Sequence, residues 1–171
     1  MISLIKFLST SAWYWWLLIL AGVGFESVGL IYQYMLDYGP CPLCIHVRIG
    51  IAGFVLVSIV ALLVNRLAWW RISHLLTAAI MAWLSERAYM LLGTERGFVY
   101  TECGVDSGLP SWFPIDQWLP AVFGVLESCG YTPKLFFGIS MAEALMVLFP
   151  TMLLISLMMF VVSFFASSQH R

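Results

Sequence analysis

The sequence predicts an all-α integral membrane protein built as a four-helix bundle. Hydrophobic residues make up 62% and charged residues 10% of the 171 positions, and the mean hydropathy is +0.94. Ordinary soluble domains are about 25% charged. Four apolar stretches are each long enough to cross a hydrocarbon core of about 30 Å, where only a helix satisfies the backbone of such a segment. The length allows one membrane domain, residues 1–171.

The four predicted spans are joined by two short loops and one long loop. The first span opens on a tryptophan-rich run, and a cleaved signal peptide is its alternative. We favour a span because the apolar run is too long for a signal peptide and no convincing cleavage site precedes Cys41. Spans are expected at residues 12–35, 45–64, 68–92 and 141–166, with loops at 36–44, 65–67 and 93–140.

The long loop at 93–140 contains one segment with a helical pattern. From Pro114 to Val125, apolar side chains recur at helical spacing, while Asp116 and Gln117 keep one face polar and Pro120 limits the regularity. This pattern predicts a short helix that lies in the membrane interface. A loop packed over the bundle is the alternative.

Basic residues set the predicted orientation, because they are concentrated on the cytoplasmic side of membrane proteins. Four of them flank one side and two flank the other. We therefore expect both termini and the loop 65–67 in the cytoplasm, and the loops 36–44 and 93–140 in the periplasm. The four are Lys6, Arg66, Arg71 and Arg171, and the two are Arg96 and Lys134. A net charge of -1 without a basic run argues against nucleic-acid binding.

All four cysteines lie on the predicted outer side, Cys41 and Cys44 in the first loop and Cys103 and Cys129 in the second. On an oxidising side they make two pairs. Two structural disulfides or a four-thiolate zinc site are the alternatives. Such zinc sites usually have a second C-x-x-C or a nearby histidine pair, which this sequence lacks, so we expect no metal. A purely structural, loop-closing disulfide stays open for Cys103 and Cys129.

Cys41 and Cys44 form a C-x-x-C, whose bridge closes almost no loop and adds little stability. The spacing is instead typical of pairs that switch between dithiol and disulfide. Cys44 directly precedes the second predicted span, at the positive end of a helix dipole, and Arg48 follows one turn later on the same face. Pro40 and Pro42 stiffen the turn. Both the dipole and the arginine favour the thiolate of Cys44 and make it a good leaving group.

These features together resemble the DsbB family of bacterial membrane thiol oxidases. The resemblance consists of four spans, a C-x-x-C before the second span with an arginine four residues later, and a distant cysteine pair in the second outer loop. The segment Trp-Phe-Pro-Ile-Asp-Gln-Trp-Leu-Pro at 112–120 and Phe-Gly-Ile at 137–139 are also similar to that family. The resemblance covers nearly the whole chain.

The resemblance implies an enzyme of the bacterial inner membrane that carries electrons from a periplasmic partner to quinone. The partner is a soluble, thioredoxin-fold thiol oxidase of the DsbA type, and the acceptor is exchangeable ubiquinone or menaquinone. The partner's reduced cysteine would attack Cys103 and open the Cys103–Cys129 disulfide. The Cys41–Cys44 pair would reoxidise the outer pair, and Cys44 beside Arg48 would then reduce the quinone.

The sequence departs from the family pattern at the outer end of the third span. Members often carry a histidine there, whereas residues 87–92 contain none. His46 is the candidate substitute in the quinone site. Glu26, Glu86 and Arg87 are charged residues inside predicted spans, where charge is expensive and points to function. They pair to fix helix packing, for example Glu26 with Arg87, or Glu26 lies on a proton path linked to quinone, or the charged ends snorkel to the interface from spans with other bounds.

Two other functions stay open from the residues alone. Enzymes of the vitamin K epoxide reductase type also combine a helical bundle with a C-x-x-C, but they carry the motif late in the chain rather than before the second span. A non-catalytic membrane scaffold with structural disulfides would resist mild reduction and consume no quinone.

Overall fold

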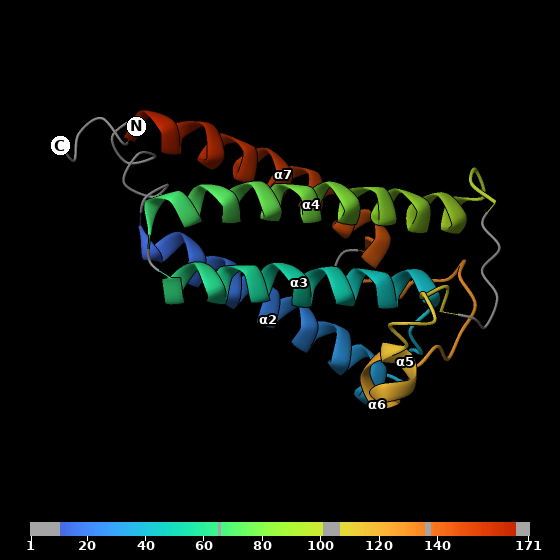
Figure 1. Ribbon diagram of the computed structural model, residues 1–171. Helices are drawn as coiled ribbons and strands as arrows, with labels where there is room; N and C mark the ends of the chain where they lie inside the picture. The colour runs from blue at the N-terminus through green and yellow to red at the C-terminus, as the bar shows by residue number, and fades with distance from the viewer. Residues whose placement is uncertain (1–10, 65, 101–106, 136–137, 167–171) are drawn as a thin grey trace.

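The protein is a bundle of four long helices, seen in a computed structural model that describes residues 11–64, 66–100, 107–135 and 138–166. The helices run side by side along most of their length (Figure 1). In the described part, β pairing is confined to one isolated bridge between Lys134 and Ser140. The predicted all-α class is confirmed. The long helices are α2 (Ala12–Met35), α3 (Pro42–Val64), α4 (Leu67–Arg96) and α7 (Met141–Ala166).

All four helices are long and apolar enough to cross a membrane. Their outward faces carry large apolar side chains, such as Leu63, which is 78% exposed, and Val147, which is 71% exposed. A surface of this kind is stable in lipid and not in water. The prediction of four membrane-spanning helices is therefore confirmed.

Three helix boundaries differ from the predicted ones, and the smallest difference is at α4, which begins at Leu67 instead of residue 68. Helix α3 begins at Pro42 rather than at Ile45, and a proline suits the first turn because the N–H that it lacks has no partner there. Helix α4 continues to Arg96 rather than ending at Leu92, and stops at Gly97, whose φ of 75° gives a left-handed cap. The earlier start of α3 places the second cysteine of the C-x-x-C inside a helix.

Helix α7 begins with a reciprocal cap. The amide of Glu143 donates to Ser140 Oγ at 3.2 Å, and the amide of Ser140 donates to Glu143 Oε2 at 2.9 Å. This capping box satisfies two backbone donors that the first turn would leave unpaired. Glu143 also pairs with Arg96 at the end of α4, which joins the outer ends of the two helices.

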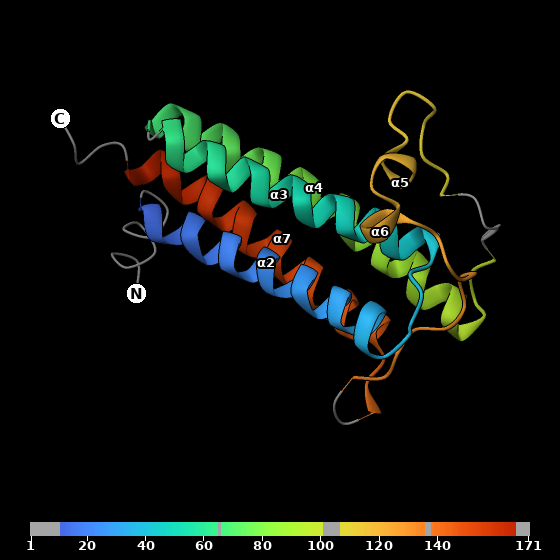
Figure 2. The same ribbon diagram turned by 90° about the horizontal axis from the view of Figure 1, so that it is seen from below.

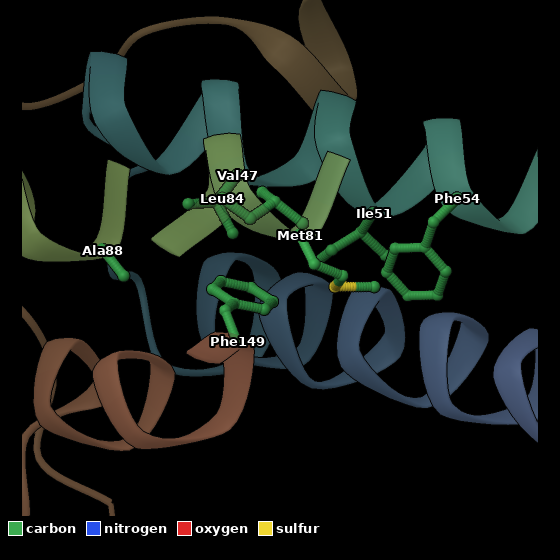
Figure 3. Close-up of a cluster of buried hydrophobic side chains, with 7 residues drawn as sticks. All are labelled: Val47, Ile51, Phe54, Met81, Leu84, Ala88 and Phe149. Carbon is green, nitrogen blue, oxygen red and sulfur yellow. The ribbon is translucent and has the colours of Figure 1, made fainter. Parts of the chain in front are cut away.

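The core lies where α3, α4 and α7 meet (Figure 3). Helix α4 packs against both α3 and α7, and α2 packs against α3. Gly50 lets α3 approach α4 closely, because a Cβ there would lie 2.5 Å from Leu84 Cδ2. The buried side chains of this cluster are Val47, Ile51, Phe54, Met81, Leu84, Ala88 and Phe149.

A second buried cluster lies at the end of the bundle where α2 begins and α7 ends. His74 of α4 is fully buried, and its ring stacks on Trp15 with centroids 4.6 Å apart. The hydroxyl groups of Tyr14 and Ser156 are 3.3 Å apart and share a hydrogen bond. These polar contacts join α2, α4 and α7.

The opposite end of the bundle carries two short helices, α5 (Ile115–Trp118) and α6 (Pro120–Phe123). They lie at the end that holds the α2–α3 connection, away from the α3–α4 connection (Figures 1 and 2). The sequence predicted one element here, and the structure divides it at Leu119, because Pro120 starts a new turn. A position in the membrane interface stays a prediction.

Candidate active site

The C-x-x-C lies at the start of α3 with both thiols free. Cys41 is 2% exposed, and its Sγ accepts a hydrogen bond from the amide of Cys44 at 3.3 Å. The hydrogen bond between the two side chains, together with burial, raises the pKa of the Cys41 thiol. Cys44 lies in the first turn of α3, where the positive end of the helix dipole stabilises negative charge. The two sulfurs therefore have different surroundings, and Cys41 is the one held as a thiol.

The outer loop packs directly on the C-x-x-C loop. The amide of Leu126 donates to the carbonyl of Pro40 at 3.0 Å. Gly39 is needed at this contact, since a Cβ on it would lie 2.7 Å from Leu126 Cβ. The segment that leads to Cys129 is therefore anchored beside Cys41.

Cys129 is disulfide-bonded, and it packs against the buried cluster that contains Cys41. The other members of this cluster are Leu43, Leu91 and Ala142. Cys103 lies outside the described residues. The structure thus brings three of the four predicted cysteines to one end of the bundle, where Cys44 and Cys129 both pack against the cluster that contains Cys41.

Arg48 is buried, with 7% of its surface exposed, and it connects three segments of the chain. Its Nη1 donates to Gln33 Oε1 and to the carbonyl of Val122, both at 2.6 Å, and its Nη2 donates to the carbonyl of Gly29 at 3.0 Å. Gln33 in turn donates to the carbonyl of Ala121 at 3.0 Å. Arg48 and Gln33 together hold α6 against α2 and α3.

Gln33 is a site residue that the sequence did not predict. It is only 9% exposed and bridges Arg48 to the outer loop. The available signal was a polar side chain near the end of an apolar span, and such residues usually face the bundle interior. That signal does not reveal which partner the side chain binds.

A cavity of about 380 Å³ opens next to Cys44. It lies between α2, α3, α7 and the loop around Tyr131, and most of its lining is apolar. Cys44, Arg48 and Glu26 are among its polar lining groups, whereas Cys41 does not line it. Cavities of this size and character bind small hydrophobic molecules, with a few polar groups fixing their orientation. The arrangement exposes one thiol of the pair to such a molecule.

The structure places His46 and the predicted pair of Glu26 and Arg87 differently from what the sequence led us to expect. His46 does not line the cavity. Its ring lies 6.1 Å from that of Trp83 on α4, and its part in quinone binding stays a prediction. The pairing of Glu26 with Arg87 is wrong, because Arg87 Nε lies 3.0 Å from Glu86 Oε2. Arg87 also extends over the Trp83 ring, and Glu26 lines the same cavity as Arg48.

Comparison with known proteins gives consistent matches along the chain. The family model described as disulfide bond formation protein DsbB matches residues 11–159. Disulfide bond formation protein B of Shewanella frigidimarina is 31% identical over 134 residues, which cover 77% of this chain and 79% of that protein. The protein of the same name from Shewanella loihica is 29% identical, covering 86% and 87%. That of Haemophilus influenzae is 26% identical, covering 100% and 98%.

Proposed function

Because the chain belongs to the DsbB family of disulfide bond formation proteins, we propose that it carries electrons from a periplasmic thiol oxidase to membrane quinone. Family membership supports a disulfide-forming oxidoreductase. The partner would be a soluble, thioredoxin-fold protein of the DsbA type. A strongly oxidising partner can be regenerated only by an acceptor of higher potential, and quinone dissolved in the bilayer meets that need.

We propose the thiol steps that the resemblance to the DsbB family implies. The partner's thiolate attacks Cys103, the Cys103–Cys129 bond breaks, and a mixed disulfide forms at Cys103. The partner's second cysteine then attacks the partner sulfur of this mixed disulfide, which releases the oxidised partner and leaves Cys103 and Cys129 reduced. The outer pair then reduces the Cys41–Cys44 disulfide, and the packing of Cys129 against the cluster of Cys41 supports that exchange.

The observation that carries the quinone proposal is the apolar cavity lined by Cys44 and Arg48. A quinone supplies a two-electron oxidant that becomes quinol. Its flat, hydrophobic head fits an apolar cavity in a membrane bundle. Arg48 has five N–H donors, of which the described hydrogen bonds use three, so further donors remain to orient a quinone oxygen. The chemistry suits ubiquinone and menaquinone alike.

The function is tested with purified protein, a reduced DsbA-type partner and each quinone in turn. We expect the partner to become oxidised while quinone absorbance falls in equal amount, two thiols for each quinone. The matched control is Cys44→Ser, which should consume no quinone. A wild-type protein that leaves quinone unchanged and keeps its disulfides under mild reduction would be a structural scaffold instead.

We propose a bacterial inner-membrane location with both termini in the cytoplasm and the cysteines in the periplasm. The α3–α4 connection and the C-x-x-C lie at opposite ends of the bundle (Figure 2), so the two sites should face different compartments. Reporter fusions after residue 134 are expected to be active as periplasmic reporters, and fusions after residue 65 as cytoplasmic ones. The reverse pattern would put the cysteines in a reducing compartment, where the thiol relay cannot operate.

A further inference from the structure

Glu26 is a carboxyl group inside a membrane span, and it lines the cavity that Cys44 and Arg48 also line. Among the residues that the structure describes, its Oε1 is buried and has no hydrogen-bond partner. A buried polar atom without a partner is costly, because it has lost its hydrogen bonds to water and gained none in the protein. Carboxyl groups within membrane spans are rare and usually mark ion or proton pathways. The unpartnered oxygen therefore points to a function inside the cavity.

The reaction proposed above has a proton requirement in this cavity. Counted from the two thiols, formation of the Cys41–Cys44 disulfide removes two electrons and two protons, and the Cys44 proton leaves when its thiolate forms. Reduction of a quinone to quinol would consume two electrons and two protons. A group in the cavity that Cys44 lines could pass protons between these two reactions.

The groups around Glu26 leave few other carriers for these protons. On α3, the guanidinium of Arg48 has donors only and no atom that accepts a proton, and Cys44 is one of the thiols whose proton has to be carried. The other polar side chains that line the cavity from α2 and the adjoining loops are the phenols of Tyr32, Tyr38 and Tyr131, so Glu26 is the carboxyl group among its lining residues. Helix α7 contributes to the cavity lining only Met141, Ala144, Leu145 and Leu148, and α4 contributes Leu91.

We infer that, if the chain reduces quinone as proposed, Glu26 carries protons from the C-x-x-C thiols to the quinone. Its carboxylate accepts a proton as a thiol gives one up, and its carboxylic acid returns that proton to a quinone oxygen. The residue ends each cycle in its starting state, so atoms and electrons balance without any further reactant. Its place in the cavity that also exposes Cys44 allows both transfers to occur inside one site.

The test is a single-turnover measurement on the purified full-length protein. The C-x-x-C is reduced beforehand, short-tail ubiquinone is added at several concentrations, and quinone absorbance is followed by stopped flow. Glu26→Gln keeps the side-chain shape but cannot carry a proton, and we expect it to lower the maximal rate about a hundredfold. The quinone concentration that gives half the maximal rate should not change. Glu26→Asp should be intermediate, and Glu86→Gln, outside the cavity, should match the wild type.

A second measurement does not depend on the variant's activity. Wild-type protein labelled with ¹³C-glutamate should show an infrared carboxyl band that shifts when short-tail ubiquinone binds. The band should persist in Glu86→Gln and be absent from Glu26→Gln. A wild-type protein whose labelled carboxyl bands ignore the quinone would overturn the inference even if Glu26→Gln does not fold.

The outcomes separate this inference from the proposed function. If the wild type reduces quinone and Glu26→Gln does so at the same maximal rate, only the role of Glu26 is wrong. If Glu26→Gln weakens quinone binding without lowering the maximal rate, Glu26 binds quinone but carries no proton. If the wild type does not reduce quinone at all, the proposed function itself fails.

Discussion

Replacing Cys129 by serine is expected to abolish turnover and to leave the partner covalently attached to the protein. Without Cys129 the outer pair cannot form its disulfide, and the free Cys103 thiolate instead attacks the disulfide of the oxidised partner to give a mixed disulfide. No Cys129 thiol is then present to attack Cys103 and displace the partner, so the adduct persists. Serine has nearly the same shape, and Cys129 is only partly buried against the cluster of Cys41, so the fold should persist. The adduct is measured by non-reducing electrophoresis after mixing with oxidised partner.

Cys103→Ser is the matched control for this experiment, because it removes the proposed point of attack and should give no adduct. Combined replacement of both residues should also give none. An adduct at Cys41 in a chain that retains the outer pair would contradict the relay, since the partner would then reach the inner pair directly.

Arg48→Ala is expected to slow quinone reduction about a hundredfold, which corresponds to about 3 kcal/mol. The substitution removes hydrogen-bond donors and positive charge from the cavity beside Cys44. It also leaves Gln33 Oε1 and the carbonyls of Gly29 and Val122 without the donor that they share. Arg48→Lys keeps the charge but loses the planar fork, so its rate should lie between those of the alanine variant and the wild type.

The structure also changes which other step Arg48→Ala should affect. On sequence grounds the arginine acts only on quinone, but its bond to the Val122 carbonyl anchors the outer loop as well. We therefore expect slower exchange between the outer pair and Cys41–Cys44, with the attack of the partner on Cys103 least affected.

Stopped-flow quinone absorbance and trapped thiol states measure these steps separately. Arg87→Ala, whose side chain lies outside the cavity, is the control. If Arg48→Ala reduces quinone at the wild-type rate, the role proposed for Arg48 is wrong.

Much of the fold follows from local properties of the sequence. The lengths of the apolar stretches predicted four membrane helices, because a bilayer sets a minimum length and requires an internally bonded backbone. The same residues, 12–35 and 141–166, form α2 and α7. Cys44 and Arg48 line one cavity for an equally local reason, since residues four apart lie on one helix face.

The boundaries of α3 and α4 depended on finer features than hydropathy. Pro42 and Cys44 read as loop residues because they precede the apolar run, yet proline is well tolerated in a first helical turn. Helix α4 extends to Arg96 because Gly97 supplies the left-handed cap. Both features are present in the sequence, but the apolar pattern alone does not detect them.

Tertiary packing alone decided which partners the polar residues bind. The spacing of Arg48 and Cys44 gives no sign that Arg48 binds Gln33 and the Val122 carbonyl, because those partners come from segments distant in the chain. The rotation of each helix about its axis put Glu26 into the cavity and His46 against Trp83. Such rotations are set by close contacts like that of Gly50 with Leu84 and by docking of the outer loop at Gly39. These contacts join side chains far apart in sequence, which is why periodicity could predict the helices but not the site.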